Sequence, residues 1–372
     1  MTTTYETPGM ATDRPPGDLS RLLFGHLHRS DQQRWGHVYL QGLLRTHGKK
    51  TVRRMAAVVT GSEAASASLH QFVNASPWEW APARGELARW AARSLPVRAW
   101  TLAPAVLPKR GNCSAGVHQR FLPEAGRTVN CQLGLGLFLD AGRAHVPVDW
   151  RLFLPPRFTR DEAVRDRAKI PPTTRAQPLW AHALCLVQEM TSWSNGRSAP
   201  VVADLTSLCD VAPLAQRLHG DGHTFVLAVP GQTAVAGPEL APGDRESARG
   251  LLLRRGVRHP AGAGRQVVSC DAPVHGLRPD GERVSGAGRL LAEWDTAAGR
   301  PGRIWLTNIT DRHPAELLEL ARSPGGAQEA TRRMGEDFGL LDFEGRSFPG
   351  WHRHMTLVSA AYACSTLEGR GR

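Results

Sequence analysis

The chain has 372 residues, of which 41% are hydrophobic and 22% are charged. This length allows two or three domains with a sizeable core, and the composition is ordinary for a soluble globular protein. The longest apolar run falls short of the roughly 18 residues that a membrane-spanning helix needs, and the net charge of +12 favours a polyanionic partner.

Two features favour a cytoplasmic protein. The first residues, 1–17, are polar and proline-rich and lack the basic and apolar segments of a secretion signal, so we expect a disordered leader there. The six cysteines form no CxxC pair, and several lie in apolar segments. This favours reduced thiols and argues against a disulfide framework or a zinc site.

Residues 18–95 are predicted to form a helical domain. The stretch DLSRLLFGHLHRSDQQRWGHVYLQGLL has apolar residues at helical spacing, and two more short helices are separated at Pro77. One basic turn in this domain is suited to phosphate contacts and contains Lys49, Lys50, Arg53 and Arg54. The competing interpretation is a solvated basic helix face.

From residue 97 the pattern changes to strands. VRAWTLAPAVL is strand-like, residues 129–139 alternate between apolar and small or polar side chains, and Val146 to Leu154 alternate again on one expected face. Gly134 and Gly136 would lie on the face opposite the leucines and allow close packing. These segments predict a three-stranded antiparallel meander.

Helices and strands then alternate. We expect a helix over 176–191, a strand over 200–205, a second helix over 211–222 and a strand over 224–231. The order is β-β-β-α-β-α-β, and the helical connections favour parallel pairing of the later strands. A Gly- and Arg-rich region with short β-like pieces follows, and then a strand over 303–310 and closing helices.

Common catalytic motifs are not met. GLLRTHGKKT fails the phosphate-loop spacing and lies in a helical context, and no GxSxG occurs. His352 and His354 are two residues apart, so on a helix they point to different faces and form a poor metal pair.

Several segments, taken in order, resemble an insertion-sequence transposase of the DDE type. They are LPKRGNCSAGVHQRF, AGRTVNCQLGLGLFL, VDWRLFLP, PVVADL with FVLAVPG, IWLTN, and FGLLDFEGRSFPGWHRHMTL. The resemblance spans roughly residues 20–365 and implies an α/β, ribonuclease-H-like mixed sheet interrupted by a β insertion and preceded by a helical domain. The expected parts are a leader 1–17, a helical DNA-binding-like domain 18–95, a first DDE part 96–231, a β-rich insertion 232–302 and a last DDE part 303–366.

The resemblance implies a catalytic centre of three carboxylates that hold two divalent metals about 4 Å apart, with Mg²⁺ or Mn²⁺ as the cofactor. Aligning LPKRG places the first carboxylate at Ala103, and PVVADL places the second at Asp204. Counting back from FGLLDFEGRS places the third at Gln328. Only Asp204 is a carboxylate, so the sequence predicts an incomplete metal site and, if the site is inactive, no cofactor. The competing interpretation of Asp204 is a turn or helix cap.

Substitute carboxylates exist near these positions. Asp140 ends one strand, Asp149 lies on the next, and Glu329, Glu336 and Asp337 lie on the predicted helix of Gln328. For Asp140 a turn beside Gly142 is the stronger interpretation, and for Glu336 and Asp337 a solvated helix face. Asp149 lies opposite the expected face of Val148 and Trp150, where it faces either solvent or the expected catalytic centre.

Two more basic groups fit a DNA partner. Lys109 and Arg110 follow the first strand, near the expected catalytic centre, and Arg346, His352, Arg353 and His354 lie near the last helix. Phosphate contacts need only positive charge in the right place, so they can outlast catalysis.

Three functions remain open. The first is a catalytically inactive, transposase-derived DNA-binding protein. The second is an active transposase or endonuclease that uses substitute carboxylates, and the third is a non-DNA enzyme that reuses the cleft. We do not favour an enzyme. A homodimer is expected only because the family that the chain resembles usually acts as dimers. Metal-dependent nicking, DNA binding without cleavage, or a bound metabolite would distinguish the three.

Overall fold

A computed structural model describes residues 17–122, 126–193, 199–236, 245–262 and 264–368. Helices and strands are mixed within them, so the expected α/β class is confirmed. The expected leader lies outside the described residues except for Gly17. None of the described helices combines the length and the apolar character needed to cross a membrane.

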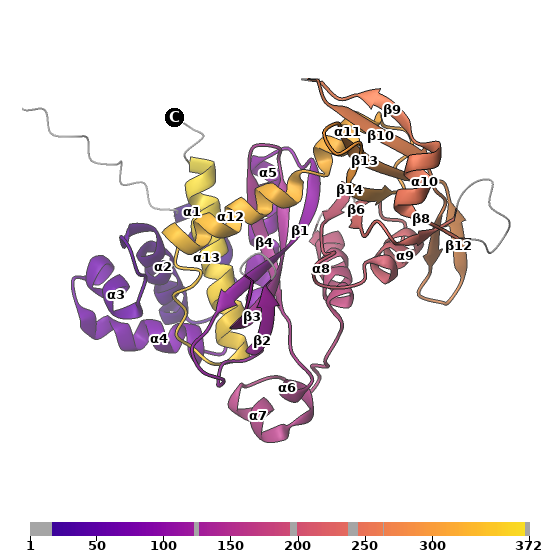
Figure 1. Cartoon of the computed structure of the whole chain (residues 1–372). Helices are drawn as coiled ribbons and strands as arrows, with labels where there is room; N and C mark the ends of the chain where they lie inside the picture. Colours follow the sequence, from indigo (N-terminus) through magenta and orange to yellow (C-terminus); the bar gives the residue numbers. More distant parts are fainter. Residues whose placement is uncertain (1–16, 123–125, 194–198, 237–244, 263, 369–372) are drawn as a thin grey trace, which may run out of the picture.

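Helices dominate the N-terminal part, which lies beside the last helix of the chain (Figure 1). They are α1 (Gly17–Phe24), α2 (Ser30–Arg45), α3 (Val52–Thr60), the short η1 (Glu63–Ala65), α4 (Ser66–Asn74) and α5 (Trp80–Ser94). The ends of α3 follow from its sequence. The Thr51 side chain accepts a hydrogen bond from the Arg54 amide at the N-terminus, and Gly61 adopts φ 70° at the C-terminus.

A mixed sheet forms the centre of the molecule. Its first strands are β1 (Ala99–Pro108), β2 (His118–Leu122), β3 (Arg127–Asp140), β4 (His145–Leu152), β5 (Val201–Ala203) and β6 (Phe225–Val229). β1 pairs antiparallel with β3 and parallel with β5, and β5 pairs parallel with β6, as the helical connections predicted. Those connections contain α6 (Arg157–Arg160), α7 (Glu162–Arg167), α8 (Leu179–Trp193) and α9 (Ala212–Gly220). β2 was not expected; it pairs with the first half of β3.

Part of the region expected as an insertion continues the same sheet, whereas β7 with β8 and β11 with β12 form two separate two-stranded sheets. It contains β7 (Ala234–Val235), β8 (Glu246–Ser247), α10 (Ala248–Arg255), β9 (Val257–Pro260), β10 (Gln266–Asp271), β11 (Val274–Leu277), β12 (Arg283–Gly286) and β13 (Arg289–Asp295), and it is followed by β14 (Arg300–Thr307). β14 pairs antiparallel with β6, and β13, β10 and β9 follow outward in that order. The edge of β6 is therefore covered by further strands, which satisfies its backbone groups.

Two long helices close the chain on one face of the sheet. After α11 (Pro314–Leu320), α12 (Ser323–Asp337) lies against β1, and α13 (Phe348–Glu368) lies against β4. The Trp150 indole donates to Ser359 of α13 at 2.8 Å, and the rings of Phe338 and Tyr362 join the ends of α12 and α13. Residues 350–364 of α13 are buried on all sides.

The expected single apolar face of β4 is wrong. Trp150 lies opposite Gly136, whereas Val146 lies opposite Leu139, so Trp150 and Val146 point to opposite faces of the sheet. A register shift between Leu137 and Phe138 causes this, because one extra residue in β4 inverts the alternation.

The close packing expected at the two β3 glycines is confirmed. A Cβ on Gly134 would lie 3.1 Å from the Trp351 ring of α13, and a Cβ on Gly136 would lie 2.7 Å from the Trp150 ring. The two glycines thus give the tryptophans room to lie against the backbone of β3.

We predict that Gly136→Ala lowers the free energy of unfolding by about 1–3 kcal/mol, because the new methyl group must displace two buried aromatic rings. Gly325→Ala in α12 is the matched control. Apart from its own helix turn, no atom of the described residues lies within 4 Å of its added Cβ, so alanine should stabilise the helix by up to about 1 kcal/mol. Urea unfolding of both variants measures this, and equal stabilities would contradict the packing argument.

Candidate functional site

β1 and β5 bring the first two expected catalytic positions together. The parallel register pairs Leu102 with Ala203, so Ala103 and Asp204 are the next residues along two neighbouring strands. Ala103 also lies opposite Gly136 of β3 and is only 1% exposed. The sequence alignment therefore selected two positions that are neighbours in space, but one of them has a methyl side chain.

The Asp204 carboxylate is already engaged. Its Oδ1 atom accepts hydrogen bonds from the backbone amide (3.3 Å) and hydroxyl (2.8 Å) of Thr206, which forms the turn after β5. Its Oδ2 atom forms an ion pair with the guanidinium of Arg303 on β14. The contacts of Asp204 with Thr206 are those of a turn-capping residue, as the competing interpretation expected. Arg303 places a positive charge beside the carboxylate.

The third expected position points away from the sheet. Ala327 and Ala330 are the buried residues of this part of α12, whereas Gln328 and Glu329 are exposed between them. Arg332 lies between Glu329 and Glu336 and pairs with both one turn away. Its hydrogen bond lowers the pKa of Glu329. The carboxylates of α12 thus form a solvated ion-pair ladder on the outer face.

Asp140 is separated from the Ala103 position. It pairs with Ala99 at the start of β1, four residues before Ala103, which corresponds to about 13 Å along the strand. Its carboxylate accepts from the Gly142 amide at 2.6 Å and from the hydroxyl of Ser323 at the start of α12. Asp140 therefore shapes the β3–β4 turn and holds the N-terminus of α12.

Asp149 lies on the other face of the sheet from Ala103. It is opposite Leu137, whereas Ala103 is opposite Gly136, and adjacent residues of β3 point to opposite faces. Its Oδ1 atom lies 2.6 Å from Nη1 of Arg84 in a pair that is almost fully buried. Burial raises the pKa of Asp149 to about 7 although Arg84 opposes this shift.

These residues do not fit a two-metal centre. Asp337 is exposed, like its neighbours on the outer face of α12. Across the part of the chain that the structure describes, no three His, Cys, Asp or Glu side chains lie close enough to hold a metal ion. The single carboxylate at the expected place faces an arginine, whereas Mg²⁺ requires several hard oxygen ligands.

Four residues predicted to contact DNA are buried, which contradicts that prediction for their side chains. Lys50 donates its ammonium group to the Thr46 carbonyl, and burial lowers its pKa. On α13, His352 stacks on Trp80 with ring centroids 4.6 Å apart. Arg353 donates to the Trp78 carbonyl at 3.0 Å.

His354 lies between helices that are far apart in sequence. Its Nδ1 atom is 3.1 Å from the Tyr39 hydroxyl, and its Nε2 atom is 3.1 Å from the Gly339 carbonyl oxygen. His352 and His354 do point to different sides of α13, as their spacing predicted. Both serve the helix core, so they are removed from the proposed DNA-contacting set.

The remaining basic residues gather around one loop. The loop 339–347 between α12 and α13 contacts the turn before α3 through Glu344, which lies 3.6 Å from Lys49. It contacts the end of β1 through the Phe343 carbonyl, which accepts from Lys109 at 2.8 Å. Arg110 and Arg346 are exposed and adjoin these contacts in the chain, whereas the exposed Arg53 pairs with Glu63 and the exposed Arg54 donates to the His47 carbonyl at 2.9 Å.

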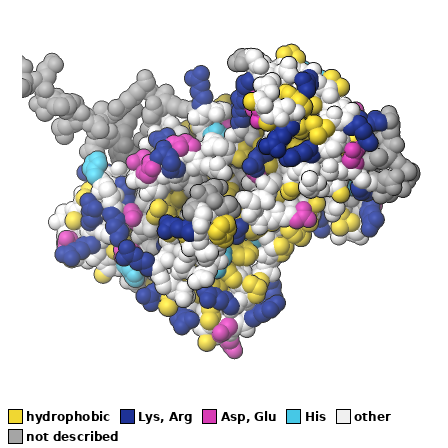
Figure 2. Space-filling view, in the orientation of Figure 1, with side chains coloured by type: hydrophobic (Ala, Val, Ile, Leu, Met, Phe, Trp, Pro, Cys, Tyr) yellow, Lys and Arg dark blue, Asp and Glu magenta, His cyan; other side chains and the backbone are white. Residues whose placement is uncertain are grey.

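This basic loop lies at some distance from the Ala103 position. β1 continues to Pro108, so Lys109 is six residues beyond Ala103, about 20 Å along an extended strand. The expectation that Lys109 and Arg110 lie close to the catalytic centre is therefore wrong. Dark-blue Lys and Arg side chains in Figure 2 also cover the N-terminal helices and the strands that extend the sheet.

Arg84 is a residue that the sequence reasoning missed. It lies on the buried side of α5 with Leu87 and Ala88, at the helical spacing of three and four residues. A charged residue within an otherwise apolar helix stripe was the available signal. It donates to the Thr356 hydroxyl at 2.8 Å and to the Trp150 carbonyl at 2.6 Å, which joins α5 to α13 and β4.

Comparison with known proteins identifies one family. The family model described as "DDE superfamily endonuclease" matches residues 22–283, which is more than half of the chain. The match contains the Ala103 and Asp204 positions and ends before α12. Among curated proteins, none matches the chain.

We predict that His354 contributes to acid destabilisation. Burial lowers its pKa from 6.5 to about 3, so the unfolded chain takes up the proton first as the pH falls below 6.5. Between pH 7 and pH 5 this costs about 2 kcal/mol of stability. Between pH 7 and pH 5, the free energy of unfolding of His354→Gln should therefore fall by about 2 kcal/mol less than that of the wild type, as measured by urea unfolding. The exposed His70→Gln control should keep the wild-type dependence, and an unchanged slope in His354→Gln would refute the assignment.

Proposed function

The chain belongs to the DDE superfamily endonucleases, and from this we propose that it is a transposase-derived DNA-binding protein whose two-metal catalytic centre is incomplete. The family supports a transposase-like role in DNA processing. Inactivity, DNA binding and an insertion-sequence origin are our proposals.

One observation carries the proposed inactivity: Asp204 lies beside Ala103 and is paired with Arg303. Two-metal catalysis requires anionic ligands that hold both cations next to the scissile phosphate. Alanine offers no ligand atom, and a metal near Asp204 would have to displace a guanidinium or tolerate its repulsion. The exposed Gln328 side chain adds no charge from α12.

The substitute carboxylates support the same proposal. Asp140 holds a turn and a helix start, Asp149 pairs with Arg84 on the other face of the sheet, and the α12 carboxylates point outward. For any of these carboxylates to bind a metal at the expected centre, its present contacts would have to break and its side chain would have to move across or along the sheet. Accordingly, we do not favour an active enzyme built on substitutes.

We propose DNA as the partner because the chain carries a large positive charge although two of the three expected metal-binding positions lack a carboxylate. The net charge is +12, and exposed arginines lie around the loop 339–347 at the junction of α3, β1 and α13. Such residues can neutralise phosphates without any requirement for precise geometry. We place the main DNA contact on this loop together with the helical region 18–95.

The metal proposal is tested by calorimetric titration of Mn²⁺ into the purified protein, with and without duplex DNA. We expect no saturable binding, so that the isotherms of the wild type and of Asp204→Ala superimpose. A parallel assay of supercoiled plasmid in Mn²⁺ should show no nicking. Asp280→Ala controls for nonspecific binding to surface carboxylates, because Asp280 is an exposed aspartate between β11 and β12.

The opposite result would reverse the proposal. Saturable Mn²⁺ binding or nicking that disappears in Asp204→Ala but persists in Asp280→Ala would establish a functioning centre.

The DNA proposal is tested with Arg110→Glu combined with Arg346→Glu. Fluorescence anisotropy with a labelled duplex should show at least tenfold weaker binding. The slope of log affinity against log salt concentration should decrease by roughly 0.9 for each phosphate that the variant no longer neutralises. The matched control combines Arg300→Glu and Arg312→Glu, which make the same charge change at exposed positions of the β extension and the segment after β14. Equally weakened binding in both pairs would mean that only net charge matters, and this loop would not be the interface.

A further inference from the structure

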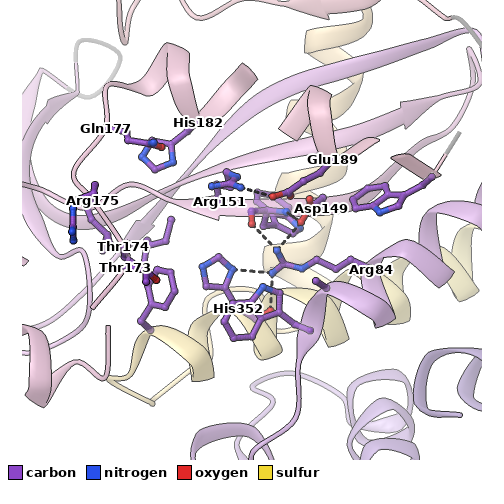
Figure 3. A pocket seen from close by; sticks show the side chains of 17 residues that line it. Arg84, Asp149, Arg151, Thr173, Thr174, Arg175, Gln177, His182, Glu189 and His352 are labelled. Carbon is purple, nitrogen blue, oxygen red and sulfur yellow. Dashed lines mark hydrogen bonds and ion pairs between the residues drawn. The ribbon is translucent and has the colours of Figure 1, made fainter. Parts of the chain in front are cut away.

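A cavity of about 500 Å³ lies on the face of the sheet opposite the Ala103 position. It is enclosed by residues of α5, β4, α8 and α13, and the segment 173–177 lines its rim (Figure 3). Asp149 is almost fully buried inside it, whereas Thr173 and Arg175 are exposed. The cavity therefore opens to solvent at this segment.

Several polar atoms in the cavity have no partner among the residues that the structure describes. Within those residues, both ring nitrogens of His182, the Nε2 atom of His352 and the Oδ2 atom of Asp149 are buried without a hydrogen bond. These residues are more than nine-tenths buried. Buried polar groups are almost always paired, since leaving one unpaired costs free energy. Their convergence on one cavity indicates a ligand with several hydrogen-bonding groups.

The charges in the cavity are balanced in pairs. Arg84 pairs with Asp149, and Arg151 pairs with Glu189 (Figure 3). Burial lowers the pKa of His182 to about 4 and, with Arg84 nearby, lowers the pKa of His352 well below its usual value, so both rings are neutral near pH 7. A neutral, polar ligand group fits this place best, because a charged group would compete with the carboxylates that already pair with Arg84 and Arg151.

The rim has a different character. Arg175 is exposed, and its guanidinium donates one hydrogen bond to the Pro172 carbonyl at 2.6 Å, which leaves further donors of its planar group available. An anionic group on the same ligand would meet this arginine at the opening.

Aromatic rings form part of the walls. Trp80 and Phe348 line the cavity beside His352, and Trp193 lines it from the end of α8. Aromatic walls with a few convergent polar groups suit a flat heterocycle, which can contact the rings while its edge forms hydrogen bonds.

We propose that this cavity binds a nucleotide, with the base held by His182, His352 and Asp149 and the phosphate group at Arg175. A base is neutral, planar and carries both donors and acceptors on its edge, and the phosphate supplies the anion that the rim favours. The site stands on the cavity alone and does not require the proposed DNA interface. The nucleotide can be free in solution or can be extruded from a DNA strand, and the two sources are experimentally separable.

The first experiment is calorimetry of the full-length protein with deoxyadenosine 5′-monophosphate, deoxyadenosine and ribose 5-phosphate. We expect the nucleotide to bind most tightly and ribose 5-phosphate to bind at least tenfold more weakly, because it lacks the base. Arg175→Ala should weaken nucleotide binding but leave nucleoside binding unchanged, a split that general misfolding cannot produce.

His182→Leu tests the base contact, with affinity expected to fall about tenfold or more for both nucleotide and nucleoside. His26→Leu is the matched control: within the described residues its ring nitrogens also have no hydrogen-bond partner, but His26 lies outside the cavity. It should leave both affinities unchanged.

A duplex containing one 2-aminopurine separates the two sources. An increase in its fluorescence that is lost in His182→Leu but kept in His26→Leu supports an extruded base, whereas nucleotide binding without that increase supports a free nucleotide. The proposal is overturned if neither signal appears, if ribose 5-phosphate binds as tightly as the nucleotide, or if the two histidine variants behave alike.

Discussion

The buried Arg84 side chain is the contact on which the arrangement of the molecule depends. It extends from α5 to Asp149 and the Trp150 carbonyl of β4, and to Thr356 and the His352 carbonyl of α13. An unpaired charge in this place would cost several kcal/mol, so α5, the sheet and the closing helix must assemble together. The N-terminal helices are thereby integrated with the α/β core, although in the sequence they adjoin only β1.

This integration accounts for the polar residues of α13. A helix that is buried on every side has no solvent-facing stripe, so each polar side chain must find a partner inside the protein. Arg353 uses backbone carbonyls near α4, and His354 joins Tyr39 of α2 to Gly339. His352 meets this requirement only at Nδ1, which lies 3.1 Å from Nη2 of Arg84, whereas its Nε2 atom has no hydrogen-bond partner among the described residues. Residues that look like a basic DNA-binding cluster in the sequence are therefore core residues.

The sequence predicted those features that local patterns encode. Alternation identified the strand around 129–139, and the resemblance to the DDE family selected Ala103 and Asp204, which the structure places side by side. Local patterns could not predict features that depend on contacts between residues far apart in the sequence. The bulge that inverts the face of β4, the continuation of the sheet from β6 to β14, and the burial of Lys50 all arise from tertiary contacts. A lysine beside three other basic residues has the same local pattern whether its ammonium group is solvated or bound to a carbonyl.

The Asp204–Arg303 pair balances the charge of the one carboxylate at the expected catalytic positions without a metal. Three carboxylates in one place repel each other and need cations of comparable charge, which two divalent metals supply. A single carboxylate needs only one positive charge, and Arg303 provides it from β14 while also joining β5 to the strands that extend the sheet. The buried methyl group of Ala103 needs no compensation at all. Under the proposed function, the remaining carboxylate is compatible with a structural ion pair, and this part of the fold needs no metal to balance its charge.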